Sequence, residues 1–315
     1  LKKYSNEQWM YGDPTSFELR CALAEKHKIF TENIIVGEGI DGLLGYLVRL
    51  LISEGDHVVT SDGAYPTFNY HVNGFGGNLH KVPYLNDCED IIALIEKAHS
   101  VDAKLIYFAN PDNPMGTHVP GSNIVDALKD LPTGCLFILD EAYSEFAPSA
   151  SLPDLEITDA RVVRLRTFSK AYGMAGARVG YAMAEKNLIK SFEKIRNHFG
   201  MNRLAQKAAL EALSDNQWLL EMVQKVENGR QRIYKIAAKN NLKSITSSTN
   251  FVAIDCGEDG GFARKVLTEL ISLGIFVRMP FVSPQDRCIR ISVGEKKDLD
   301  KFETALPIAL DRASK

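Results

Sequence analysis

The chain has 315 residues, of which 45% are hydrophobic and 24% are charged, and its formal net charge is −3. These proportions are typical of a soluble globular protein, and the length fits either one large α/β domain or two unequal domains. The composition argues against a nucleic-acid partner, because no stripe of lysine and arginine is present to neutralise phosphates along a duplex.

Alternating elements fill the first two thirds of the chain. Strands are predicted at residues 33–37, 57–61, 78–82, 104–109, 135–139, 162–167 and 178–183. Helices are predicted at residues 16–27, 41–52, 66–73, 88–99, 122–130 and 187–199. This alternation indicates the α/β class, with a large domain at residues 30–215 whose mostly parallel sheet is sandwiched by helices.

The pattern changes after about residue 215. A long helix is predicted at 216–240, with strands at 250–255, 275–278 and 288–292 and further helices at 262–273 and 299–313. We expect a smaller α+β domain that comprises residues 1–29 and 216–315.

Cysteine usage and hydropathy indicate the cellular setting. The five cysteines are widely spaced, and neither they nor the seven histidines show the spacing of a metal site. We therefore expect no metal and a reduced, cytoplasmic environment. No apolar run reaches the length of a membrane span and no signal peptide is visible, so no membrane partner is expected.

The segment TFSKAYGMAGARVG, residues 167–180, combines a lysine with hydroxyl groups and an arginine. Lys170 can act as a nucleophile toward a carbonyl group if burial or neighbouring cations keep its amine neutral. Thr167, Ser169 and Arg178 can bind an anion. An amine beside an anion site suits an aldehyde cofactor that carries a phosphate. A loop with a solvated lysine explains this segment alone equally well.

A carboxylate follows the apolar run at residues 135–139. A buried charge needs a partner, so we expect Asp140 to face a cation, and a protonated pyridine nitrogen would serve. An Asp that caps the following turn is the alternative, and this segment alone does not separate the two. Glu141 is expected behind the site or at the surface.

Two segments offer groups that can contact a planar ring. In NPDNPMG, residues 110–116, two Asn-Pro steps present Asn113, whose amide can hydrogen-bond a ring oxygen. Tyr65 stands just after a predicted strand and can stack on a ring. A structural turn is the alternative for the first segment, and a core aromatic is the alternative for Tyr65.

Two other segments offer anion-binding groups. In VGEGIDG, residues 36–42, the amides of Gly39, Ile40 and Asp41 lie at a predicted helix N-terminus, which favours an anion, although a plain glycine turn is also consistent. Arg290 lies inside an otherwise apolar strand, where an arginine rarely stays unpaired. It can bind a substrate carboxylate, or it can form an internal salt bridge.

In their order and spacing, Tyr65, NPDNPMG, DEAY, TFSK and RCIRISVG resemble the pyridoxal-phosphate-dependent aminotransferases of the aspartate aminotransferase fold. The chain is most similar to the histidinol-phosphate aminotransferase-like branch, over nearly its whole length. The resemblance implies a homodimer with shared active sites and pyridoxal 5'-phosphate as cofactor. It also implies ping-pong transfer of an amino group from histidinol phosphate or an aromatic amino acid to a 2-oxo acid. A decarboxylase of the threonine-phosphate type and a non-catalytic sensor are the alternatives.

The resemblance also implies residue roles. Lys170 would bind the cofactor aldehyde covalently and then carry a proton, and Asp140 would hold the ring nitrogen. Asn113 and Tyr143 would bond the ring oxygen, and Tyr65 would stack on the ring. The cofactor phosphate would be bound by Gly39, Ile40, Asp41, Thr167, Ser169 and Arg178.

The remaining implied roles concern the substrate and the partner subunit. Arg290 would take the substrate α-carboxylate, Arg278 resembles a contact to a substrate phosphate, and Asn113 would also face the substrate. Tyr11 resembles the tyrosine that reaches the cofactor phosphate of the partner subunit.

The chain departs from the family pattern in several places. NPMG replaces the usual NPTG, and Gly42 stands where relatives commonly carry an acidic residue. HFGMNR at residues 198–203 does not match the pattern expected beside Arg278, and the arm that covers the substrate in relatives is not found. The resemblance therefore does not identify the substrate.

Overall fold

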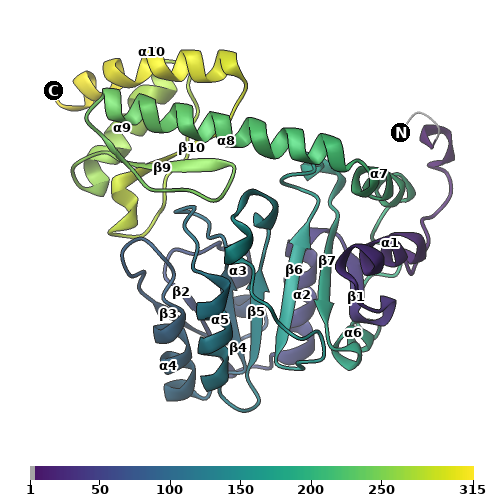
Figure 1. The fold of residues 1–315 in the computed structure, drawn as a ribbon. Coiled ribbons are helices and arrows are strands. Elements are labelled where there is room, and N and C mark those ends of the chain that lie inside the picture. The colour runs from purple at the N-terminus through teal and green to yellow at the C-terminus, as the bar shows by residue number, and fades with distance from the viewer. Residues whose placement is uncertain (1–3) are drawn as a thin grey trace.

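The computed structural model describes residues 4–315, and its central feature is a sheet of seven strands in the order β1-β7-β6-β5-β4-β2-β3 (Figure 1). The strands are β1 (Ile34–Gly37), β2 (His57–Ser61), β3 (Asn78–Val82), β4 (Leu105–Ala109), β5 (Leu136–Asp140), β6 (Val162–Thr167) and β7 (Gly180–Ala184). Strands β2 to β6 pair in parallel, and β7 runs antiparallel to both β1 and β6. The mostly parallel sheet predicted from the sequence is confirmed.

Helices cover both faces of this sheet (Figure 1). Both faces need a cover because the strands carry apolar side chains on each of them. One face carries α2 (Gly39–Leu51), α3 (Thr67–Gly74) and α6 (Lys186–Phe192). The other face carries α4 (Ile91–Val101) and α5 (Gly121–Ala127) over its middle, and α1 (Phe17–His27) and α7 (Arg203–Ser214) over β1 and β7. The sandwich leaves the strand ends free to carry loops.

A second, smaller sheet lies above the first (Figure 1). It has the order β10-β9-β8, is antiparallel, and consists of β8 (Lys243–Ser244), β9 (Phe251–Asp255) and β10 (Cys288–Ser292). Its core also includes residues of α8 (Asn216–Lys239), α9 (Gly260–Ser272) and α10 (Lys296–Ala313). The predicted α+β unit near the C-terminus is therefore present.

The division into domains stays a prediction. Helix α1, which we grouped with the smaller domain, buries Leu19 and Leu23 in one cluster with Val36 of β1 and Tyr181 of β7. Residues 1–3 of that predicted domain lie outside the described residues.

Two predicted elements differ in the structure, and one helix is additional to those predicted. The helix expected at 187–199 ends at Phe192, since the backbone at Ile195 and Asn197 bonds instead to Arg49 and Tyr46 of α2. Helix α7 was not predicted, although Asn202 caps it by accepting a hydrogen bond from the amide of Ala205. The strand expected at 275–278 is a single bridge between Arg278 and Arg290.

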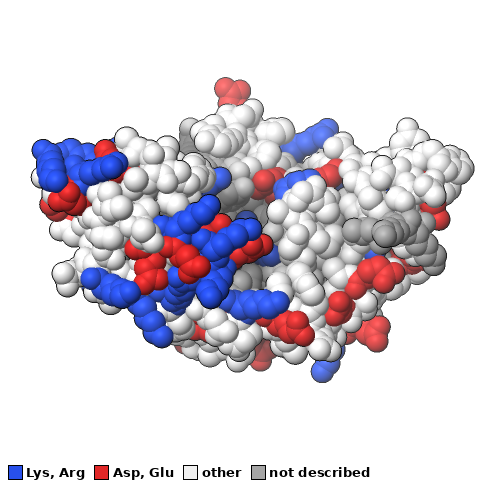
Figure 2. Space-filling view, turned by 90° about the horizontal axis from the view of Figure 1, so that it is seen from above, with Lys and Arg blue, Asp and Glu red and all other residues white. Residues whose placement is uncertain are grey.

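Acidic and basic side chains are interspersed on the face that Figure 2 shows. Ion pairs join α8 to α10, with Arg232 contacting Asp300 and Glu303, and Lys239 contacting Glu303. Within residues 4–315, no group of three or more metal-ligating side chains comes together, and none of the helices has the length and apolar character to cross a membrane.

Candidate active site

A cleft of about 540 Å³, open to solvent, lies beyond the carboxyl ends of the parallel strands. Its lining comes from the loops that follow β1, β2, β4, β5 and β6, as expected where parallel strands end together. Ten of the predicted site residues line it, namely Ile40, Asp41, Tyr65, Asn113, Asp140, Tyr143, Thr167, Ser169, Lys170 and Arg178.

Lys170 stands on a turn that internal hydrogen bonds shape. The hydroxyl of Thr167 donates to the carbonyl of Val179 at 3.1 Å and accepts from the amide of Ser169 at 3.0 Å. This turn presents the Lys170 amine to the cleft, where Nζ lies 5.2 Å from the ring centroid of Tyr143. Burial lowers the pKa of Lys170, although the charge of Asp140 opposes the shift. The amine is thus easier to deprotonate than that of an exposed lysine.

Asp140 ends β5 and is buried at the floor of the cleft. Its Oδ2 accepts from the hydroxyl of Tyr107 at 2.7 Å, and its Oδ1 accepts from the amide of Ala142 at 2.9 Å. Burial raises the pKa of Asp140 to about 6, and these two hydrogen bonds only partly offset it. The bond from the amide of Ala142 caps the turn, as expected if Asp140 has a structural role. No ion pair neutralises the carboxylate within the described residues, so the second interpretation, in which Asp140 faces a bound cation, also fits.

An anion cradle lies where α2 begins. Gly39 has a φ of +84°, which favours glycine, and a Cβ there would lie 2.5 Å from Nη2 at the end of the Arg178 side chain. Arg178 donates to Oγ of Ser169 at 3.3 Å and lies 3.7 Å from a carboxylate oxygen of Asp41. Backbone amides at the start of α2, a hydroxyl and a guanidinium therefore surround one end of the cleft.

Tyr65 forms one wall of the cleft and is tied to this cradle. Its hydroxyl donates to Oδ1 of Asp41 at 3.0 Å, and burial raises the pKa of Tyr65 to about 12. The phenol is therefore neutral and its ring is held against the cleft.

Arg290 comes from β10 of the small sheet and lies over the ring of Phe251, with Cζ 4.6 Å from the ring centroid. Its Nη1 donates to Oδ1 of Asn113, while its buried Nε has no hydrogen-bond partner. No carboxylate forms an ion pair with it among residues 4–315, so the salt-bridge alternative lacks support. Burial lowers the pKa of Arg290.

Of the other predicted site residues, Gly39 lies at the cradle, and Arg290, Arg278 and Tyr11 do not line this first cleft. Arg278 lines an adjoining cleft together with Arg290, Asn113 and Tyr65. Tyr11 is 79% exposed, and its ring packs 4.9 Å from that of Phe199.

Tyr107 lines the cleft but was not singled out from the sequence. It is fully buried in β4, and its hydroxyl binds Asp140. The available signal was a tyrosine in the otherwise apolar run LIYFA, because a buried hydroxyl needs a partner.

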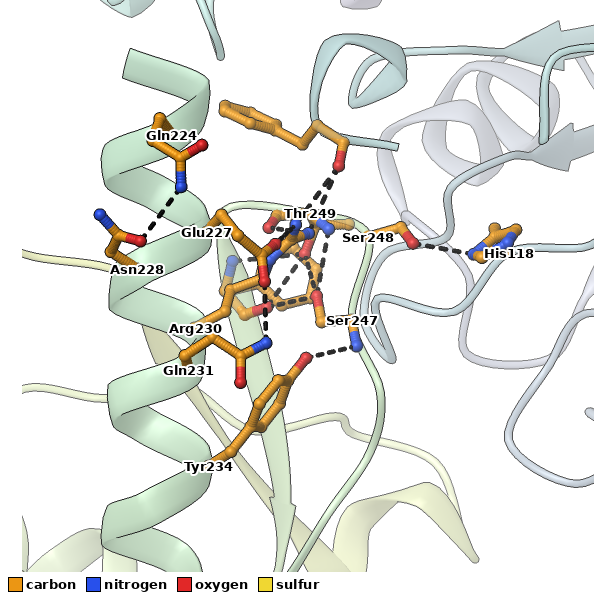
Figure 3. A network of polar contacts seen from close by, with 12 residues as sticks. His118, Gln224, Glu227, Asn228, Arg230, Gln231, Tyr234, Ser247, Ser248 and Thr249 are labelled. Atoms are coloured by element: carbon orange, nitrogen blue, oxygen red, sulfur yellow. Dashed lines mark hydrogen bonds and ion pairs between the residues drawn. The ribbon is translucent and has the colours of Figure 1, made fainter. Parts of the chain in front are cut away.

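The small sheet contacts the loop that carries Asn113 through the turn at residues 247–249 (Figure 3). Oγ of Ser248 lies 2.8 Å from Nδ1 of His118, and the amide of Ser248 donates to the carbonyl of Gly116 at 2.7 Å. Gly116 has a φ of +81°, and a Cβ there would lie 2.6 Å from Oγ of Ser247. The glycine of NPMG is therefore required for the close approach of this turn.

Comparisons with known proteins agree with this geometry. The model of the family "Aminotransferase class I and II" matches residues 5–306. The histidinol-phosphate aminotransferase of Moorella thermoacetica is 32% identical over 310 residues, which are 97% of this chain and 79% of that protein. Histidinol-phosphate aminotransferase 2 of Carboxydothermus hydrogenoformans is 33% identical over 305 residues, covering 96% of this chain and 83% of that protein.

A solved structure is more similar still. The crystal structure of histidinol-phosphate aminotransferase from Sinorhizobium meliloti in complex with pyridoxal-5'-phosphate has 48% sequence identity and a TM-score of 0.97. The match covers 98% of this chain and 85% of that chain. L-threonine-O-3-phosphate decarboxylase from Porphyromonas gingivalis, at 21% identity and a TM-score of 0.82, shares the fold. The chain belongs to the class I and II aminotransferase family.

Proposed function

We propose that this aminotransferase uses pyridoxal 5'-phosphate to move an amino group from histidinol phosphate to a 2-oxo acid. The observation that carries the proposal is the meeting of Lys170, an unneutralised Asp140 and an incompletely bonded Arg290 around adjoining clefts. The choice of donor rests on the relatives at 32%, 33% and 48% identity, which are named histidinol-phosphate aminotransferases.

The residues of the cleft fit pyridoxal phosphate. Asp140 is a buried carboxylate that forms no ion pair among residues 4–315, and a protonated ring nitrogen would supply the cation for one. The start of α2 and Arg178 form a cradle suited to the phosphate, and the guanidinium of Arg178 lies close to Gly39. When bound, the cofactor supplies an aldehyde that reacts with amines and a ring that withdraws electrons.

Lys170 is the proton-transfer group in this proposal. Its lowered pKa makes a neutral Nζ more available, so the amine can accept a proton from the donor carbon that bears nitrogen and later return it. Tyr107 and the amide of Ala142 hold Asp140 in place, and Asp140 would pair with the ring nitrogen. Asn113 and Tyr143 line the same cleft and would contact the ring oxygen.

Arg290 and Arg278 are the substrate-binding cations in this proposal. Arg290 offers a free Nε–H and a guanidinium fixed over Phe251, which suits a planar carboxylate. Arg278 lines the same adjoining cleft and would contact the donor's phosphate. Because a ping-pong enzyme binds donor and acceptor in turn, the same subsite serves both.

We also propose a cytoplasmic homodimer. Exposed aromatic side chains cluster on the N-terminal segment and near it, with Trp9 81%, Tyr11 79% and Phe199 55% exposed. Tyr11 would then reach the cofactor phosphate of the partner subunit. All five cysteines are free, which agrees with a reducing compartment. Sedimentation of the purified protein tests the dimer, and a monomer at micromolar concentration would contradict it.

The test of the function is a half-reaction without acceptor. The cofactor-loaded protein should show visible absorbance that histidinol phosphate bleaches faster than phenylalanine, tyrosine or aspartate does. Faster bleaching by an aromatic amino acid would replace the proposed donor. Release of carbon dioxide would favour a decarboxylase, for which the decarboxylase neighbour at 21% identity supports only the fold.

Lys170→Ala tests the role of the lysine. We expect the characteristic absorbance to be lost and transamination to fall by about 10²–10⁴-fold, which is the usual contribution of a positioned acid–base group. Lys190→Ala, on the exposed side of α6, is the matched control and should behave as the wild type. An unchanged spectrum in Lys170→Ala would rule out the assignment.

A further inference from the structure

Two carboxyl groups lie buried side by side beneath the loop that carries Asn113. Glu89 is 4% exposed and Asp112 is 2% exposed, and their side chains are hydrogen-bonded to each other. Neither forms an ion pair with a cation within residues 4–315. Neither was assigned a role in the site described above.

Four donors hold the pair. The hydroxyl of Ser61 donates to Oε2 of Glu89 at 2.7 Å, and the amide of Ala109 donates to Oε1 at 3.2 Å. The hydroxyl of Tyr84 donates to Oδ1 of Asp112 at 2.8 Å, and the amide of Met115 donates to Oδ2 at 3.0 Å. The pair therefore ties the ends of β2 and β4, and the segment after β3, to the loop at residues 110–116.

A hydrogen bond between two carboxyl groups requires a proton on one of them, and two buried like charges in contact repel strongly. Burial raises the pKa of Glu89 well above its ordinary value and raises that of Asp112 to about 6. The nearby titratable groups Tyr84, Tyr107 and Cys88 have raised pKa values and are neutral. Asp87 is ion-paired with Arg287, and Arg290 is the cation that acts on Asp112.

We propose that Glu89 carries a proton that it donates to Asp112, and that this shared proton positions Asn113 and, through it, Arg290. Asp112 then keeps its bonds to Tyr84 and Met115, so the loop stays in place. Asn113 of this loop accepts from Nη1 of Arg290. On the other side, His118 of the same segment contacts Ser248 (Figure 3), and the carbonyl of Gly116 accepts from the amide of Ser248.

Glu89 and Asp112 are thus positioning residues that act through Arg290. The inference rests on the carboxylate-binding role proposed for Arg290 above. Removal of the shared proton at alkaline pH leaves two adjacent negative charges, which push Asp112 and the loop away from Glu89. The KM for the 2-oxo acid should then rise with pH while kcat changes less.

Infrared difference spectroscopy of the cofactor-loaded protein tests the proton directly and needs no substrate. The wild type at neutral pH should show the carbonyl stretch of a protonated carboxyl group, and Glu89→Gln should lack it. The amide keeps the volume and can still donate to Asp112. Asp90→Asn is the matched control, because Asp90 caps α4 next in sequence and should leave the band in place. A wild-type spectrum without the band, or a band that survives in Glu89→Gln, overturns the proposal.

Kinetics separate positioning from a merely structural role. In Glu89→Ala, Asp112 loses its donor, and we expect the KM for the 2-oxo acid to rise about tenfold with a smaller change in kcat. Glu89→Gln should restore the KM and remove its rise at alkaline pH. Equal KM values in Glu89→Ala and the wild type would overturn the link to Arg290. Failure of histidinol phosphate as donor would contradict only the proposed function, since the infrared band does not depend on it.

Discussion

Asp140 and Glu141 are neighbours at the end of β5, both are buried, and their electrostatic surroundings are opposite. Asp140 faces the cleft without an ion pair, and burial raises its pKa to about 6. Burial would also raise the pKa of Glu141, but Arg166 and Arg164 outweigh it and lower that pKa. The N–O distance to Glu141 is 2.6 Å from Arg164 and 2.9 Å from Arg166.

The difference shows how one strand end serves two purposes. Successive residues of a strand point to opposite faces, so a single step in sequence moves a carboxylate from the ligand side to the scaffold side. On the scaffold side the charge is neutralised by the protein itself, and on the ligand side neutralisation is left to what binds. Arg287 and Arg290 show the same contrast. Arg287 forms ion pairs with Asp87 and Asp255, whereas Arg290 forms no ion pair with a carboxylate among residues 4–315.

Glu141→Gln should cause the largest loss of stability. Removal of the buried charge leaves two partly buried arginines with a neutral partner, and breaking such an ion pair costs about 3–5 kcal/mol in the free energy of unfolding. Denaturant unfolding measures this loss. Exposed ion pairs contribute up to about 1 kcal/mol. If Glu141→Gln changed the free energy of unfolding by less than this, Glu141 would not differ from a surface carboxylate, and its contrast with Asp140 would be lost.

Asp140→Asn should have the opposite profile. The amide cannot neutralise a cationic ring nitrogen, so we expect activity to fall about 10²–10³-fold, as for other lost electrostatic groups in active sites. The cofactor-free protein should be as stable as the wild type or more stable at neutral pH, because a buried charge has been removed. Steady-state kinetics and thermal unfolding check the two halves, and a strongly destabilised variant with normal activity would reverse our assignment.

Arg290→Lys should raise the KM for the 2-oxo acid by about 10–100-fold, because a lysine keeps the charge but loses the two-pronged geometry. Arg287→Lys is the matched control, since it lowers stability through its pairs with Asp87 and Asp255 but leaves the KM unchanged. Equal KM increases in the two variants would show that the unpaired arginine has no special role.

The pH dependence of stability in the cofactor-free protein should also separate the two carboxylates of β5. Because the folded-state pKa of Asp140 is raised, its contribution is fully present below about pH 4 and is lost as the pH rises through about 6. The total is about 2–3 kcal/mol, and Asp140→Asn should abolish it. Glu141 has a lowered pKa, so its contribution is present above the unfolded pKa and is lost as the pH falls through the folded one. Slopes of the same sign for both residues would contradict the comparison.

Much of the large sheet could be predicted because its strands are short apolar runs with polar loops at their ends. β2, β3 and β6 have the predicted bounds, and the other strands of this sheet differ by one or two residues. Helix α7 was missed although its buried residues Ala205, Ala209 and Leu213 recur every four positions, as on one face of a helix. The strand predicted at 275–278 is not formed, because Arg278 alone pairs with β10. The number of residues that pair with a neighbouring strand is decided by the tertiary structure.

Ten cleft residues were named from motifs alone, since each motif follows a strand and parallel strands bring their ends together. Glu141 was expected behind the site or at the surface, and it is buried with two arginines of β6. Nothing in DEAY distinguishes its second carboxylate from a surface residue, because the arginines that neutralise it lie 23 and 25 residues later.

The sequence by itself determined the fold class, the family and the reactive groups, because these depend on local patterns and on the order of short motifs. Only the tertiary structure decided which charges are neutralised within the protein and which are left for a ligand. The contact of Arg290 with Asn113 spans 177 residues, and the pairing of Glu89 with Asp112 joins two loops. Such contacts arise from packing between elements that are distant in sequence, so no local pattern records them.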